Sequence, residues 1–344
     1  MDKRRILAKA KVAATPPGMI NSVLGPISPD NIGTTLVHEH FAFAYPGWQA
    51  DDTIAPYDYK AVLKTNLAAI KAAQKYGIKT IIDATTNDVG SRNPTLYKEL
   101  ARKTGVNIIC STGLYTEHEG SPTYFKTMHA WYGIDISKLM SELFIKEITK
   151  GISKTGVKAG VIKCGTSGGG PISPYETAVL KAAVVAQKTT GVPIITHTEG
   201  PLGGVEQAEL FLAESVNPKK VMIGHVSNSS DIEYHKMILK KGVYIAFDRI
   251  GFEFITPTDI NVKNIAELCK LGFASQIMLS HDTVNVWLAR QNTAAPAHVL
   301  EVLANWRMDF ISEKVVPALK AQGVTDEQIK AMMVDNPRNL FLGQ

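Results

Sequence analysis

Short apolar runs rich in β-branched residues alternate along the chain with longer stretches that have helical periodicity. Most of the short runs are apolar at nearly every position, which is typical of strands buried on both faces of a parallel sheet. Between them, apolar residues recur every three to four positions, as in amphipathic helices. Eight runs are therefore predicted to be strands, at residues 34–41, 78–85, 106–112, 157–163, 192–197, 220–225, 242–247 and 276–282.

The order of these elements predicts the architecture. Eight strands, each followed by a helical stretch, indicate a closed (β/α)8 TIM barrel. Start and stop signals support two of the helices: Ser173 and Gly191 bound one, and Asp231 and Gly242 bound another. An open doubly wound sheet is the alternative fold, but no Gly-x-Gly-x-x-Gly fingerprint follows the first strand.

The N-terminal segment bears on domain organisation and location. We expect residues 1–18 to form a mobile arm and residues 19–344 to form a single barrel domain. Arg4 and Arg5 are adjacent, as in a twin-arginine export signal. However, the residues that follow contain further lysines and no continuous apolar segment. We therefore expect a cytoplasmic protein, with export by a degenerate signal as the alternative.

Composition excludes several classes of protein. The net charge is +5, with 45% hydrophobic and 20% charged residues, which are ordinary globular values. Basic residues are spread along the chain rather than gathered with aromatics, which argues against nucleic-acid binding. No stretch reaches the roughly 18 apolar residues of a membrane span. Cys110, Cys164 and Cys269 lie in or near apolar runs without a Cys-x-x-Cys pair, so we interpret them as core residues rather than disulfides or a zinc site.

Polar residues gather where the predicted strands end. Active sites of such barrels form at the C-terminal ends of the strands. His38 and His40 are two positions apart and should point to the same side, whereas Glu39 should point away and be structural. One strand-end histidine is more often a hydrogen-bonded core residue, but four at one rim indicate a metal site. The candidate ligands are His38, His40, Lys163, His197, His225 and Asp282.

Lys163 needs a separate explanation, because a lysine at the inner end of a buried strand is costly unless it is paired or modified. A neutral amine reacts with carbon dioxide to give an anionic carbamate, which can bridge two cations. The alternative is a salt bridge with Asp282 or Glu199. Two bridged metals could polarise a substrate oxygen and lower the pKa of a water. Asp282 would be both ligand and proton acceptor, while His281 should face the other way.

The motifs GPISPDNIGTTLVHEH, STGLY, AGVIKCGTS, GVPIITHT, MIGHVSNSSDIEY, FDRIG, IMLSHD and DNPRNLF follow one another from about residue 19 to residue 341. In this order they resemble the phosphotriesterase family of the amidohydrolase superfamily. The resemblance implies that His38, His40 and Asp282 hold a buried metal. It also implies that His197 and His225 hold a more exposed one. Carboxylated Lys163 and a nucleophilic hydroxide would bridge the two. Zinc is the expected metal, although cobalt, manganese and iron also suit such ligands.

Two further residues look like the phosphotriesterase-like lactonases: Tyr115 in STGLY and Arg249 in FDRIG. The resemblance places the tyrosine over the metals and the arginine beside the substrate. It implies hydrolysis of lactones, N-acyl-homoserine lactones among them, with side activity on phosphotriesters. The alternatives are a dedicated phosphotriesterase (aryldialkylphosphatase), a sugar lactonase, an amidase and a barrel that binds without catalysis.

Two segments bear on the substrate and the assembly. Residues 283–306 are more polar than the lid of acyl-homoserine lactonases, since they include Arg290, Gln291 and Asn292. This leaves room for sugar lactones. The insert at residues 117–135 is interpreted as loop packing or as substrate contact. The expected partners are a small-molecule substrate and a second copy in a homodimer. Exposed aromatics between Phe41 and Trp48 are candidates for an interface or a pocket wall.

Overall fold

The computed structural model describes residues 15–16, 18–168, 170–199, 203–290 and 301–344, so most of the expected N-terminal arm lies outside the described residues. Eight parallel strands form one sheet in the order β10-β9-β8-β7-β6-β5-β4-β3. Their bounds are β3 Thr34–Glu39, β4 Ile78–Asp83, β5 Asn107–Gly113, β6 Val161–Thr166, β7 Ile194–Thr198, β8 Val221–Ile223, β9 Tyr244–Phe247 and β10 Ile277–Leu279. A short antiparallel hairpin, β1 Ile20–Ser22 and β2 Gly25–Ile27, precedes them.

The edges of this sheet meet, which nearly closes it into a barrel. The backbone N–H of Asp282 donates to the carbonyl of His38 at 3.0 Å, and that of His40 donates to the carbonyl of Thr283 at 2.8 Å. These bonds join the end of β3 to the segment that follows β10. The predicted (β/α)8 barrel is confirmed, and the open doubly wound sheet is not the fold.

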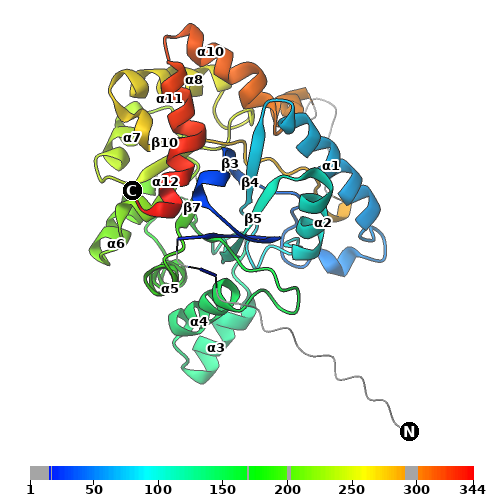
Figure 1. Ribbon diagram of the computed structural model, residues 1–344. Helices are drawn as coiled ribbons and strands as arrows, with labels where there is room; N and C mark the ends of the chain where they lie inside the picture. The colour runs from blue at the N-terminus through cyan, green and yellow to red at the C-terminus, as the bar shows by residue number, and fades with distance from the viewer. Residues whose placement is uncertain (1–14, 17, 169, 200–202, 291–300) are drawn as a thin grey trace.

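Helices surround the strands (Figure 1). In that view α1 and α2 lie on one side of the barrel, α6, α7 and α8 lie on the other, and α3 and α4 lie below. The helices are α1 Tyr59–Gln74, α2 Pro94–Thr104, α3 Thr123–Tyr132, α4 Ile136–Thr149, α5 Pro174–Thr190, α6 Gly204–Ala213, α7 Ile232–Leu239, α8 Thr258–Lys270, α10 Val316–Ala321, α11 Asp326–Lys330 and α12 Asn336–Leu342. None of the helices in the described part of the chain is both long and apolar enough to cross a membrane.

The predicted helix signals act as expected at α5. Ser173 and Glu176 form a reciprocal capping box at its start, and Gly191 follows its end with φ 73°. Asp231 likewise caps α7. However, α7 reaches its C-cap at Lys240, two residues before the predicted stop at Gly242.

An inner apolar cluster fills the barrel and sets the direction of the site residues. Each barrel strand contributes one buried side chain to this cluster, except β9, which contributes two. Because side chains alternate along a strand, Lys163 and His197 point to the same interior, two positions beyond Val161 and Ile195. The barrel-strand residues of the cluster are Val37, Ile82, Ile109, Val161, Ile195, Met222, Tyr244, Ala246 and Met278.

All eight strands differ from the prediction by at least one residue in their bounds, and three of these differences concern site residues. β6 begins four residues later than expected, so Lys163 lies within the strand rather than at its end. β8 and β10 end at Ile223 and Leu279, so His225 and Asp282 lie beyond them. His225 has φ 57° and Asp282 has φ 56°. This left-handed conformation is incompatible with a β-strand, so neither strand can continue through these residues.

The three cysteines are buried and free, as predicted. They pack in the apolar cluster between the strands and the outer helices.

Candidate metal centre

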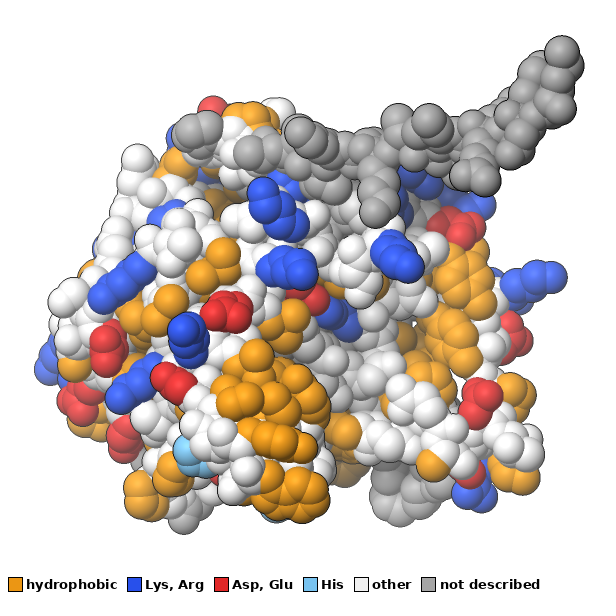
Figure 2. All heavy atoms as spheres, turned by 90° about the horizontal axis from the view of Figure 1, so that it is seen from below, with side chains coloured by type: hydrophobic (Ala, Val, Ile, Leu, Met, Phe, Trp, Pro, Cys, Tyr) orange, Lys and Arg blue, Asp and Glu red, His pale blue; other side chains and the backbone are white. Residues whose placement is uncertain are grey.

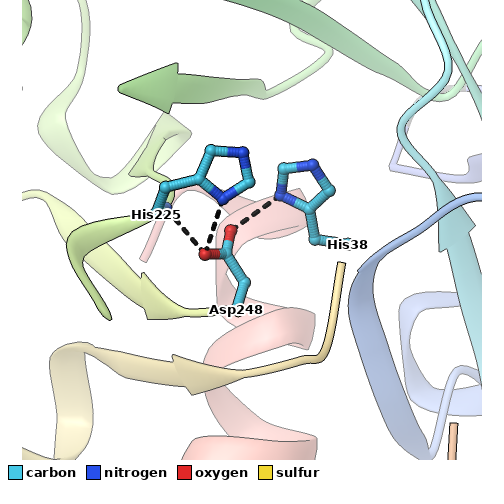
Figure 3. A group of neighbouring side chains, drawn as sticks. All are labelled: His38, His225 and Asp248. Atoms are coloured by element: carbon cyan, nitrogen blue, oxygen red, sulfur yellow. Dashed lines mark hydrogen bonds and ion pairs between the residues drawn. The ribbon is translucent and has the colours of Figure 1, made fainter. Parts of the chain in front are cut away.

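The structure brings the six predicted ligands together at the C-terminal ends of the strands, and all six are buried. Asp282 lies at their centre. Its Oδ1 is 3.1 Å from His40 Nε2 and 3.4 Å from His38 Nε2, and its Oδ2 is 3.7 Å from His225 Nε2. The donor atoms of His38, His40 and Asp282 all lie within 4.8 Å of one another, so they could hold a metal ion. Figure 3 shows His38 and His225 converging from opposite sides.

His197 occupies the other side of the group. Its ring lies edge-on to the ring of His225, with centroids 4.3 Å apart. The Tyr115 hydroxyl is 3.1 Å from His197 Nδ1, and Glu199 Oε2 is 2.8 Å from His197 Nε2. Glu199 therefore faces Nε2, and the Tyr115 hydroxyl faces Nδ1.

Lys163 is fully buried, and its immediate contacts are not carboxylates. Nζ lies 2.9 Å from His38 Nε2 and 3.0 Å from the Thr196 carbonyl. Burial lowers the pKa of Lys163 to about 8, against the opposing effect of Asp282. An amine with this pKa is partly neutral near pH 7.5, which is the form that reacts with carbon dioxide.

Three of the four imidazoles are held in the neutral form that binds metals. Burial, together with the charge of Lys163, holds the pKa of His38 well below its usual range. Burial and Arg249 do the same for His225. Burial lowers the pKa of His197 to about 4. Neutral imidazole is the metal-ligating form of histidine, so the site favours cations at neutral pH.

Asp282 is kept ionised by its neighbours. Burial alone would raise its pKa, but His38, His40 and Arg249 hold that pKa well below the usual range. Arg249 Nε donates to Asp282 Oδ2 at 2.9 Å. Arg249 Nη1 also lies 3.9 Å from Glu199 Oε2. Asp282 is therefore an anionic acceptor in a fixed orientation.

The sequence interpretation missed Asp248. It follows β9 directly and is fully buried. Its Oδ2 is 2.7 Å from His38 Nδ1, and its Oδ1 is 3.0 Å from His225 Nδ1 (Figure 3). Burial and the nearby Asp282 raise the pKa of Asp248. A cation bound on the far side of either imidazole would oppose that shift. An aspartate that directly follows the apolar run at residues 244–247 was the available signal.

Backbone strain occurs at two of the candidate ligands. His225 and Asp282 both have left-handed φ values, which non-glycine residues adopt mainly where the surroundings enforce them. Gly224 precedes His225, and a Cβ at Gly224 would lie 2.2 Å from the Thr196 carbonyl oxygen. Only glycine allows β7 and the turn after β8 to approach so closely, and this approach places His225 next to His197.

Glu39 points away from the site, as predicted. Its Oε1 accepts hydrogen bonds from the His281 backbone N–H at 3.0 Å and from Ser280 Oγ at 2.8 Å. His281 Nδ1 also lies 2.8 Å from Glu39 Oε1, so His281 faces the barrel wall.

Two of the aromatics expected to be exposed between Phe41 and Trp48 are buried, which corrects that expectation for them. Phe41 packs in the core, and Phe43 packs against Tyr115 and Trp287. Tyr45 remains partly exposed. The interpretation of this segment as a pocket wall therefore fits Phe43, because Phe43 contacts Tyr115, whose hydroxyl lies beside His197.

The insert at residues 117–135 consists of α3 and the short segments on either side of it. Tyr124, Trp131 and Tyr132 are 58%, 80% and 67% exposed. Figure 2 shows hydrophobic side chains gathered on this lower side of the molecule. His129 Nδ1 contacts the Ile134 carbonyl at 3.2 Å, and the backbone N–H of His118 donates to Ser167 Oγ at 3.1 Å. Gln291 and Asn292 lie outside the described residues, and Arg290 pairs with Asp51.

The donor set fits divalent cations. Neutral imidazoles and a carboxylate are the ligands that zinc and similar metals prefer. Each imidazole has a partner for its second nitrogen, since Thr85 Oγ1 lies 2.8 Å from His40 Nδ1 and the other three face Asp248 or Glu199. Such partners fix ring orientation in metal sites.

Known proteins share this fold and much of this sequence. A family model described as the phosphotriesterase family matches residues 18–341. An aryldialkylphosphatase from Saccharolobus solfataricus is 33% identical over 320 residues, covering 92% of this chain and 96% of that protein. The structure of an organophosphorus hydrolase from Deinococcus radiodurans is 39% identical, with a TM-score of 0.90, covering 96% of this chain and 99% of the other. A mutant of a PTE-like lactonase from the same organism is 38% identical, with a TM-score of 0.90, covering 94% and 99%.

The barrel, the gathered imidazoles and these matches define a metal-dependent hydrolase. The chain belongs to the phosphotriesterase family.

Proposed function

We propose that this hydrolase opens lactones at a binuclear metal centre and hydrolyses phosphotriesters as a side reaction. The observation that carries the proposal is the Tyr115 hydroxyl, 3.1 Å from His197 Nδ1 and therefore beside the candidate metals. The similarity to a PTE-like lactonase supports the same substrate class. N-acyl-homoserine lactones are included in that class.

The metals and the carbamate are part of the proposal. His38, His40 and Asp282 would hold one cation, His197 and His225 a second, and carboxylated Lys163 would bridge them. Two zinc ions, or cobalt, manganese or iron, would supply Lewis acidity and ionise a water at neutral pH. The pKa of Lys163, lowered to about 8, supports carbamate formation.

The chain's own residues would position the substrate and move the proton. Tyr115 donates a hydrogen bond to the oxyanion that develops from the lactone carbonyl. Asp282 accepts the proton of the attacking water, since its carboxylate is ionised and lies at the centre of the site. Arg249 holds Asp282 through the 2.9 Å bond from Nε, which keeps the accepting oxygen in place.

A sugar lactone is the second candidate, and the polar surroundings of Tyr115 favour it. The Tyr45 hydroxyl donates to Glu119 at 3.4 Å. Burial and the charge of Glu199 raise the pKa of Glu119, and the charge of Arg249 opposes that rise. Carboxylates and a guanidinium suit a hydroxylated ring better than a long acyl chain. A dedicated phosphotriesterase is the third candidate, supported by the similarity to an aryldialkylphosphatase.

The test is a comparison of initial rates on a panel of lactones and on paraoxon, using protein reconstituted with zinc and bicarbonate. Acyl-homoserine lactones, simple γ- and δ-lactones and sugar lactones form the panel. We expect lactones to be hydrolysed orders of magnitude faster than paraoxon, and Lys163→Ala to be inactive on both. Faster paraoxon hydrolysis would identify a phosphotriesterase. If zinc-loaded protein hydrolysed neither, lactone opening would be wrong and amides would be tested next.

We also propose a homodimer that covers α3. Tyr124, Trp131 and Tyr132 lie at positions i, i+7 and i+8, so they share one face of the helix, and each is more than half exposed. Tyrosine and tryptophan are enriched at interfaces, and a twofold axis places the same patch on both copies. Light scattering after gel filtration should give a dimer for the wild type and a monomer for Trp131→Ser. A monomeric wild type would contradict this.

The remaining proposals concern organisation and location. We propose that residues 19–344 form one domain behind an arm at residues 1–18, which limited proteolysis would test by trimming only the arm. We propose a cytoplasmic location, supported by three free buried cysteines that suit a reducing compartment. Cell fractionation would contradict it if the protein were exported.

A further inference from the structure

Asp248 is shared by two imidazoles that approach from different strands. His38 belongs to β3, His225 follows β8, and Asp248 follows β9. One carboxylate oxygen lies 2.7 Å from His38 Nδ1. The other lies 3.0 Å from His225 Nδ1 and also accepts the His225 backbone N–H at 2.6 Å. Figure 3 shows both rings with the second nitrogen pointing away from the carboxylate.

This contact sets the tautomer of both rings when Asp248 is ionised, the state that a cation bound at the imidazoles favours. An ionised carboxylate only accepts hydrogen bonds, so each Nδ1 then carries the proton. Each Nε2 then offers its lone pair toward Asp282, from which the two Nε2 atoms lie 3.4 and 3.7 Å. The two rings are also held nearly parallel, with centroids 4.7 Å apart and an interplanar angle of 27°.

The other two imidazoles have separate partners. Thr85 Oγ1 lies 2.8 Å from His40 Nδ1, and Glu199 Oε2 lies 2.8 Å from His197 Nε2. Each of these partners orients one ring. Asp248 is not one of the proposed ligands, yet it contacts one ligand of each proposed metal position.

We propose that Asp248 is a positioning residue that orients one ligand of each metal, so that a single carboxylate governs the occupancy of both. This inference rests on the proposed binuclear site. Loss of the carboxylate frees His38 and His225 together, whereas loss of the Thr85 hydroxyl frees His40 alone. Removing such an outer partner typically costs 10–100-fold in metal affinity.

The test compares zinc binding by wild type, Asp248→Ala and Thr85→Val, measured by competition with a chromophoric chelator and by elemental analysis of the metal content. We expect the wild type to bind two zinc ions. Asp248→Ala should weaken both by about 10–100-fold. Thr85→Val keeps the shape of the side chain and should weaken one position while leaving the other within about threefold. Thermal unfolding of the metal-free proteins checks that both variants fold.

Other results would overturn the inference. If Asp248→Ala bound two zinc ions as tightly as the wild type, or lost affinity at one position only, Asp248 would not govern both. If the wild type itself bound fewer than two zinc ions, the binuclear proposal would fail first. If Asp248→Ala does not fold, a measurement on the zinc-loaded wild type still tests the inference. Histidine ¹⁵N spectra of the zinc-loaded protein should show Nδ1–H on both rings, and zinc bound at either Nδ1 would overturn the inference.

Discussion

Glu39 and His281 are joined inside the barrel wall by a 2.8 Å contact between Oε1 and Nδ1, and neither side chain is exposed. The same carboxylate accepts the backbone N–H of Thr283 at 2.9 Å. His281 Nε2 in turn accepts the backbone N–H of Ile311 at 3.1 Å. This chain of contacts links β3 to the segment that carries Asp282, where the sheet closes.

Glu39→Ala should therefore destabilise the fold strongly. Several buried donors lose their acceptor, and each such group costs about 1–3 kcal/mol, so we expect a loss of at least 3 kcal/mol in the free energy of unfolding. Urea unfolding of the metal-free protein would measure it. Glu209→Ala, which removes an exposed ion pair with Lys241, is the control and should change stability by less than about 1 kcal/mol. Similar losses in both variants would show that Glu39 does not hold the barrel closed.

Tyr115→Phe should lower kcat on lactones about 10–100-fold with little change in KM, because the lost hydroxyl serves the developing oxyanion. Tyr45→Phe is the matched control, since its hydroxyl contacts Glu119 at 3.4 Å. Steady-state kinetics on the best lactone would compare them. An equal fall in both variants, or a rise in KM alone, would exclude an oxyanion role for Tyr115.

Arg249→Ala should shift the acid limb of the kcat/KM profile to higher pH. Arg249 helps to hold the pKa of Asp282 low, so its removal raises that pKa. Asp282 must be ionised to accept a proton, and activity is then lost at a higher pH as the solution is acidified. We also expect kcat/KM at pH 7 to fall about tenfold. Arg249→Lys should restore part of the shift. If the acid limb of the kcat/KM profile did not move, the ionisation of Asp282 would not determine it.

Reconstitution of the metal-free protein should depend on both carbon dioxide and pH. Only the neutral amine of Lys163 forms a carbamate, and its pKa is about 8. At a fixed concentration of dissolved carbon dioxide, the rate of zinc-dependent recovery should therefore rise with pH up to about 8 and then level off. Hydrolytic activity, assayed at intervals after zinc is added, would measure this rate of recovery. Recovery that is independent of carbon dioxide would contradict carbamate formation.

Much of this site could be predicted because barrel strands end at one rim. The apolar runs located all eight strands, and the polar residues after them located His38, His197 and Asp282. Side-chain alternation also predicted that Glu39 and His281 face away. These features depend on local sequence and on the period of a strand.

The remaining features depend on contacts between distant segments. The left-handed φ values of His225 and Asp282, which shorten β8 and β10, arise from packing at the site rather than from local propensity. The register of β3 against β4 shifts between Leu36 and Glu39, which alternation alone cannot predict. Asp248 was missed because its role appears only when β3, β8 and β9 lie together. The burial of Phe43 likewise depends on Trp287, far along the chain.

The most direct test of the binuclear site is anomalous diffraction at the zinc edge from crystals of protein reconstituted with zinc and bicarbonate. We predict two peaks roughly 3.5–4 Å apart. One should lie among His38, His40 and Asp282 and the other between His197 and His225, with electron density extending beyond Lys163 Nζ to both. A single peak, peaks away from these residues, or an unmodified Lys163 beside two metals would contradict it.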